Sequence, residues 1–196
     1  MSSNYTPKRI ADFESTLEQI RQDGGWAPSG GIYTLAQAIW PWAAMELVVT
    51  NRTGLGPWVL LARYKGKGIP EHYNRFHIPG GFGFEKGKPM VRDIHEWCSR
   101  VAKGELGVDV EVLGTLGFHF WTPDEHPSGG RLVSQYVAVE LLGEIKLDDD
   151  LGYFRRAEML ALGPEDMVQN HPHRNFLDQY LAALARGPVV PMNFGM

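Results

Sequence analysis

The side chain best placed for chemistry is the carboxylate of Glu105, which lies at the predicted end of a helix, just before Leu106 and Gly107. A double glycine, Gly80-Gly81, follows a short apolar stretch upstream. A carboxylate on the last turn of a rigid helix can hold a hard cation such as Mg²⁺, which prefers oxygen ligands. A glycine turn lets a backbone carbonyl, here that of Gly81, approach the same ion. Such a cation clamps the oxygens of a diphosphate and stabilises the leaving group during hydrolysis.

The stretch from Pro79-Gly80-Gly81 to Glu105-Leu106-Gly107-Val108 resembles the Nudix box, in which strand, glycine turn, loop and helix follow one another. The resemblance extends over residues 44–185 by order of elements and over residues 79–108 by motif. It implies an α+β fold, an αβα sandwich with a mixed sheet. It also implies a Mg²⁺ or Mn²⁺ ion on a nucleoside diphosphate derivative, with Glu105 as metal ligand and catalytic carboxylate, Gly81 as carbonyl ligand and Arg100 as the residue that orients Glu105.

The box lacks two of its usual glutamates. Where the family mostly has Arg-Glu-x-x-Glu-Glu, this chain has Arg100-Val101-Ala102-Lys103-Gly104-Glu105, so Val101 and Gly104 replace acids. Glu96 lies nine residues before Glu105 and therefore points from the opposite helix face, at about 100° per residue. We expect the helix to offer one carboxylate to a metal. A box that keeps only the last glutamate is similar to that of the GDP-mannose mannosyl hydrolase branch, which makes a nucleotide sugar one candidate substrate.

An acidic run, Asp148-Asp149-Asp150, precedes the predicted last strand. The likeness to that branch implies Asp149 as a second metal ligand and Asp150 as the general base. A carboxylate can accept a proton from a nucleophilic water if its pKa suits the task. Three adjacent acids are more often a solvated loop than a set of metal ligands, and both interpretations stay open. Phe82 stands where the branch has a substrate-binding arginine.

Four further side chains are candidates for substrate binding. Arg63 and Lys65 end a predicted strand at a place from which the family often reaches substrate phosphates, although a solubilising patch on an edge strand explains them as well. His119 and Trp121 lie where a base or sugar could stack, with an aromatic core as the alternative.

Three more residues have two interpretations each. His171 and His173 flank Pro172 and could bind a metal, but the start of a helix explains them equally. Cys98 is expected on the core face of the central helix, as a small buried hydrophobic residue rather than a nucleophile.

The elements that must position these residues are many short strands and a few helices. Strands are predicted over residues 45–50, 58–64, 76–81, 108–116, 117–121, 132–142 and 151–155. Helices are predicted over residues 9–22, 33–40, 90–106, 164–168 and 175–185. We expect residues 1–40 to be an N-terminal extension packed on a Nudix-like domain of residues 41–196, because so short a segment rarely holds a core alone.

Composition excludes several classes of protein. The chain has 196 residues, 43% of them hydrophobic and 11% aromatic, which fits one globular domain and excludes disorder over most of its length. A net charge of −4 without a basic run is unfavourable for binding duplex DNA or membrane surfaces. A single cysteine excludes an internal disulfide and a multi-cysteine zinc site.

Localisation and function follow as expectations. No apolar run reaches about 18 residues, and the first residues lack the apolar core of a signal peptide. We therefore expect a cytoplasmic protein whose partner is a small molecule, a nucleoside diphosphate derivative, rather than a nucleic acid or a membrane. The family resemblance leaves a homodimer open. The leading function is metal-dependent hydrolysis. The alternative, favoured by the two lost acids, is a Nudix-fold module that binds a nucleotide without cleaving it.

Overall fold

The computed structural model describes residues 42–53, 56–65, 72–82, 93–122, 125 and 132–191. The expected extension over residues 1–40, with its two helices, lies outside the described residues. The boundary at residue 41 therefore stays a prediction.

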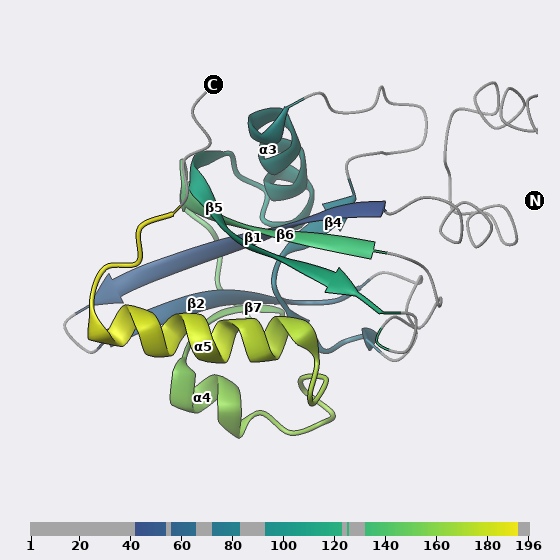
Figure 1. Ribbon diagram of the computed structural model, residues 1–196, viewed down its shortest axis with the longest axis vertical. Coiled ribbons are helices and arrows are strands. Elements are labelled where there is room, and N and C mark those ends of the chain that lie inside the picture. Colours follow the sequence, from purple (N-terminus) through teal and green to yellow (C-terminus); the bar gives the residue numbers. More distant parts are fainter. Residues whose placement is uncertain are drawn as a thin grey trace, which may run out of the picture.

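A mixed sheet lies at the centre of the fold (Figure 1). Its strands are β1 (Trp42–Thr53), β2 (Gly56–Arg63), β3 (Phe76–His77), β4 (Gly80–Phe82), β5 (Val110–Trp121), β6 (Leu132–Leu141) and β7 (Leu151–Arg155). The order is β3-β2-β1-β6-β5, with β4 paired to β1 and β7 paired to β2. Strands β1 and β6 run parallel, whereas β1 is antiparallel to both β2 and β4.

Helices cover both faces of the sheet. Figure 1 shows α3 (Ile94–Glu105) on one face, with α4 (Arg156–Ala161) and α5 (Pro172–Arg186) on the other. Successive side chains of a strand point to opposite faces, so Leu47 of β1 packs in one cluster with Cys98 of α3. Its neighbour Val48 packs in the other cluster with Leu177 of α5. This arrangement confirms the expected αβα sandwich, and it confirms Cys98 as buried.

Local signals set the ends of α3. The Asp93 side chain accepts a hydrogen bond from the Glu96 backbone N–H at 2.8 Å, which caps the helix start. Gly107 follows the helix with φ +73°, a left-handed conformation that favours glycine. The helix therefore begins at residue 94 rather than 90, while Glu105 lies on its last turn as expected.

Three details differ from the sequence-based expectation. The predicted strands over 108–116 and 117–121 are one strand, β5, whose register shifts near Gly114 and Gly117. A glycine that suggests a chain break can instead mark a bulge within a strand. The helix predicted over 164–168 is wrong, since those residues form turns and bends and the helix α4 comes directly after β7. The last helix begins earlier than predicted, at Pro172, because proline is favoured in the first turn of a helix.

No described helix is long and apolar enough to cross a membrane.

Candidate functional site

The double glycine lies beside a buried acid that the sequence analysis did not select. Strand β4 pairs with β1 so that Gly80 is opposite Glu46 and Gly81 is opposite Met45. A Cβ atom added at Gly80 would collide with Oε2 of Glu46. Position 80 therefore needs glycine so that the Glu46 carboxylate can lie against the backbone.

Glu46 is only 5% exposed and is held by polar neighbours. Ser134 Oγ donates a hydrogen bond to Oε1 of Glu46 at 2.9 Å, and His173 Nε2 lies 3.3 Å from the same oxygen. Burial alone raises the pKa of Glu46, but His173, His77 and Ser134 together lower it below the ordinary value. These neighbours favour the ionised form of the buried Glu46 carboxylate.

The side chain of Glu105 is exposed at the end of α3, although surrounding protein atoms still displace water from its carboxylate. This desolvation, and then the negative charge of Glu46, raise the pKa of Glu105. The basic side chains of the same helix are engaged elsewhere, since Arg100 bonds Glu96 at 2.7 Å and Lys103 bonds Asp109 at 2.8 Å. Within the described ranges, no lysine or arginine pairs with Glu105.

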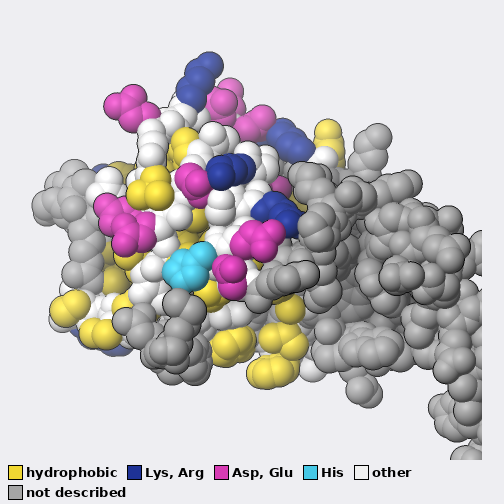
Figure 2. All heavy atoms as spheres, turned by 90° about the horizontal axis from the view of Figure 1, so that it is seen from above, with side chains coloured by type: hydrophobic (Ala, Val, Ile, Leu, Met, Phe, Trp, Pro, Cys, Tyr) yellow, Lys and Arg dark blue, Asp and Glu magenta, His cyan; other side chains and the backbone are white. Residues whose placement is uncertain are grey.

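The outer face of α3 carries charges of both signs. Figure 2, seen from the side on which α3 lies, shows acidic and basic side chains interspersed there. The bond to Glu96 gives Arg100 a partner one helical turn away. Its expected role in orienting Glu105 therefore stays a proposal.

The carbonyl of Gly81 already accepts one hydrogen bond. Trp97 Nε1 of α3 donates to this oxygen at 3.2 Å. The Val101 side chain is also close, because a Cβ atom at Gly81 would lie 3.5 Å from its Cγ2. Gly81 is also paired with Met45 in the sheet, so a cation at this carbonyl oxygen would share it with the hydrogen bonds that the oxygen already accepts.

The acidic run before β7 meets the end of β2. Arg63 Nε donates to the backbone carbonyl of Asp149 at 2.9 Å, and Lys65 Nζ lies 2.9 Å from Oδ1 of Asp150. Arg63 also pairs with Asp166 at 3.1 Å. The structure thus brings two candidate phosphate-binding cations together with the candidate ligand Asp149 and the candidate base Asp150. The described residues contain no group of three or more histidine, cysteine or acidic side chains placed to hold a metal ion.

The two aromatic candidates differ in exposure. Trp121 is 6% exposed, and its indole N–H donates to Ser134 Oγ at 2.9 Å. His119 is half-buried, makes an edge contact with the Trp121 ring at 5.3 Å, and has Nε2 3.4 Å from Oε2 of Glu125. His119 is therefore the more accessible of the two for stacking.

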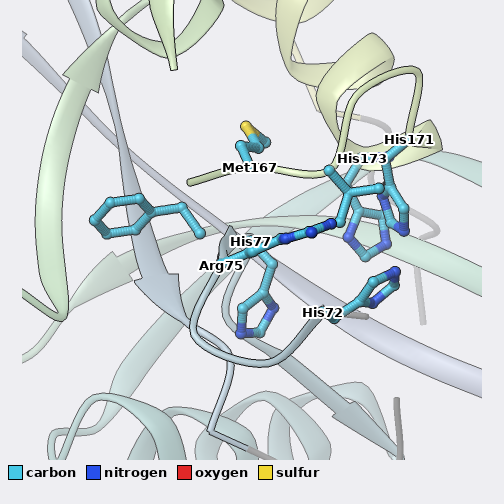
Figure 3. Close-up of a pocket in the computed structure, with 8 residues that line it drawn as sticks. His72, Arg75, His77, Met167, His171 and His173 are labelled. Carbon is cyan, nitrogen blue, oxygen red and sulfur yellow. The ribbon is translucent and has the colours of Figure 1, made fainter. Parts of the chain in front are cut away.

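Histidines converge at the start of α5 (Figure 3). The ring of His171 lies 4.7 Å from that of His173, 4.8 Å from that of His72 and 5.0 Å from that of Trp121. Burial lowers the pKa of His171 to about 2, and burial likewise lowers that of His77 to about 4. The sequence analysis selected His171 and His173 but missed His72 and His77. The sequence signal that could have identified His77 is its position just before the glycine turn.

Neither a protein-family model nor a curated protein matches this chain. Solved structures match over most of its length. A NUDIX hydrolase from Nitrosomonas europaea is 17% identical with a TM-score of 0.53, covering 80% of this chain and 98% of that one. The NUDIX domain of Shewanella oneidensis NrtR, complexed with ADP ribose, is 16% identical with a TM-score of 0.51, covering 74% and 89%. A UDP-X diphosphatase is 17% identical with a TM-score of 0.51, covering 93% and 87%. The chain therefore has the Nudix fold.

Proposed function

We propose that this Nudix-fold chain is a divalent-metal-dependent hydrolase of a nucleoside diphosphate derivative, with Glu105 as the carboxylate that holds the cation. One observation carries the proposal: desolvation and the negative charge of Glu46 raise the pKa of Glu105, and no lysine or arginine among the described residues pairs with Glu105. Two carboxylates held near each other repel, and a cation relieves that repulsion.

The chemistry of the proposed donors, all of them oxygen atoms, suits Mg²⁺ or Mn²⁺. Mg²⁺ is usually held by one or two carboxylates, with waters and substrate phosphates filling the remaining positions. We assign Glu105, the Gly81 carbonyl and Asp149 to hold it. When bound, the cation supplies charge that polarises the diphosphate and stabilises the leaving oxygen.

The other residues have roles that follow from their positions. Asp150 is exposed and can accept a proton from an attacking water, while Lys65 beside it keeps the carboxylate oriented. Arg63 and Lys65 present positive charge at the end of β2, where substrate phosphates can meet it. His119 can stack on a base or sugar, supported from behind by Trp121. Arg100 helps to fix the last turns of α3 through its bond to Glu96.

Two of the matched proteins support the substrate class. ADP ribose and a UDP derivative are both nucleoside diphosphates linked to a further group. A nucleotide sugar belongs to the same class, and the one-glutamate box favours it. This narrower assignment is part of the proposal.

Binding without hydrolysis is the alternative function. Val101 is 7% exposed and packs in the core at a position where the family mostly has glutamate. Trp97 already occupies one lone pair of the Gly81 carbonyl. Both observations favour a weaker metal site, and a module of this kind would bind the nucleotide equally well with and without Mg²⁺.

Turnover separates the two functions. The purified chain is given Mg²⁺ or Mn²⁺ with ADP ribose, UDP-sugars, GDP-sugars, dinucleoside polyphosphates and nucleoside triphosphates, and the products are separated by chromatography. We expect cleavage of at least one diphosphate, lost on chelation and lowered at least about a hundredfold in Glu105→Gln. Glu140→Gln removes an equally exposed carboxylate from the far end of β6 and should leave turnover unchanged. Nucleotide binding with no product from any substrate would establish the alternative.

A further inference from the structure

A small cavity lies between the β3 segment and the start of α5 (Figure 3). Its volume is about 10 Å³, which is room for about one oxygen-sized group. Arg75, His72, His77, His171 and His173 contribute to its lining, and among the residues that the structure describes no acidic side chain does. The described residues hold no histidine group suited to a metal, so the cavity calls for a different ligand.

Arg75 supplies an uncompensated positive charge. Its backbone is fixed, since its N–H donates to the carbonyl of His72 at 3.0 Å and its carbonyl accepts from Tyr64. Its side chain is half-buried and extends across the pocket toward the His171 side (Figure 3). In the part of the chain that the structure describes, its guanidinium has no hydrogen bond and no ion pair. A half-buried guanidinium without an acceptor favours an anion.

His171 supplies a hydrogen-bond donor. Its Nδ1 accepts the backbone N–H of His173 at 3.3 Å and so caps α5. A neutral imidazole has one protonated nitrogen, and the low pKa of His171 keeps the ring neutral. Its proton is therefore on Nε2, which is buried and has no partner among the described residues.

His173 and the N-terminus of α5 also favour an anion in the cavity. His173 is 8% exposed, and its Nδ1 is buried without a hydrogen-bond partner in the described part of the chain. Its Nε2 lies 3.3 Å from Oε1 of Glu46. The negative charge of Glu46 would repel an anion in the cavity, but the carboxylate oxygen is turned toward the His173 ring. The N-terminus of α5, a helix of 15 residues, carries a partial positive charge beside the cavity.

We propose that this cavity binds one oxygen of a phosphate group, held by the guanidinium of Arg75 and by Nε2–H of His171. One phosphate oxygen can accept hydrogen bonds from donors on two different walls, because it has several lone pairs and carries part of the negative charge of the group. The cavity shares His173 and His77 with the surroundings of Glu46, but Glu105 does not line it and phosphate binding there needs no divalent cation. This proposal goes beyond the proposed hydrolysis, because it assigns a second binding site, which takes a phosphate monoester or inorganic phosphate.

Phosphate binding to the full chain tests the proposal. Inorganic phosphate and ribose 5-phosphate are titrated in EDTA, by calorimetry and by the ¹⁵N signals of the histidine rings. We expect saturable binding, with a shift of the His171 Nε2 signal. Arg75→Gln should weaken it at least about tenfold. His171→Asn keeps a helix cap but loses the Nε2 donor, and should weaken it severalfold while the circular dichroism stays unchanged.

Two control variants distinguish phosphate binding in this cavity from non-specific attraction to positive charge and from binding at the metal site. Arg186→Gln removes one positive charge at the opposite end of α5 and should change the affinity less than twofold. Glu105→Gln should leave phosphate binding in EDTA unchanged, so that failure of the hydrolase proposal leaves this one testable. Tighter binding of ribose 5-phosphate than of inorganic phosphate would identify an ester as the ligand, and the reverse would identify the free anion. No saturable binding, or equal weakening in Arg75→Gln and Arg186→Gln, would overturn the proposal.

Discussion

The carboxylate of Glu46 occupies the space that any side chain at Gly80 would need. The two residues are opposite each other on β1 and β4, and the contact joins the glycine turn to the buried group formed by Glu46, Ser134 and His173. The glycine of the box therefore has a structural task as well as any catalytic one. It leaves room for the Glu46 carboxylate, whose negative charge raises the pKa of Glu105.

Gly80→Ala should destabilise the fold. The new methyl group would collide with the Glu46 carboxylate and lie 2.9 Å from the backbone oxygen of Met45, which should lower the free energy of unfolding by about 1–3 kcal/mol. Gly104→Ala is the matched control, because nothing lies within 4 Å of its added Cβ. There alanine should raise stability by about 0.5–1 kcal/mol. Urea denaturation measures both, and equal effects would contradict the Glu46 contact.

His77 should make stability depend on pH. Its pKa is lowered from 6.5 to about 4 by burial, so between these values the unfolded chain binds more protons than the folded one. Stability must then rise with pH over this window and fall as pH drops from 6.5 to 4. At 1.36 kcal/mol per pKa unit the contribution is about 3 kcal/mol.

His77→Gln removes that contribution, so its free energy of unfolding should fall less between pH 7 and pH 4 than that of the native chain. His95→Gln, at an exposed position on α3, should keep the native pH profile. Denaturation curves at several pH values measure the difference. Parallel pH profiles for the native chain and His77→Gln would contradict the burial of a neutral His77.

Trp97→Phe should make the Gly81 carbonyl oxygen a better ligand for a cation. Loss of the indole N–H frees the lone pair that accepts the 3.2 Å hydrogen bond and should cost about 1 kcal/mol of stability. The freed oxygen is a better cation ligand, so Mn²⁺ affinity should rise severalfold. Electron paramagnetic resonance of Mn²⁺ measures this. Unchanged affinity would show that the Gly81 carbonyl does not contact the cation.

The fold could be predicted because its signals are local. The apolar runs of β1 and β2 and the Gly107 cap of α3 each act within a few residues. The single strand β5 and the helix α4 were missed because a bulge at Gly117 resembles a turn and because six residues carry little periodicity.

The candidate site was only partly predictable. Glu105, Gly81 and the acidic run could be proposed from motif and spacing. Glu46 could not, because its partners Ser134 and His173 come from distant strands and helices. The joining of Asp149 and Asp150 to Arg63 likewise depends on the pairing of β2 with β7, which no local pattern encodes.

Mn²⁺ binding by Glu105→Gln tests the central claim most directly. The native chain, Glu105→Gln and Glu140→Gln are titrated with Mn²⁺ in the presence of a nucleoside diphosphate, and free Mn²⁺ is followed by electron paramagnetic resonance. The account predicts affinity at least about tenfold weaker in Glu105→Gln and native affinity in Glu140→Gln. Equal Mn²⁺ affinity in all three proteins would contradict Glu105 as the residue that holds the cation.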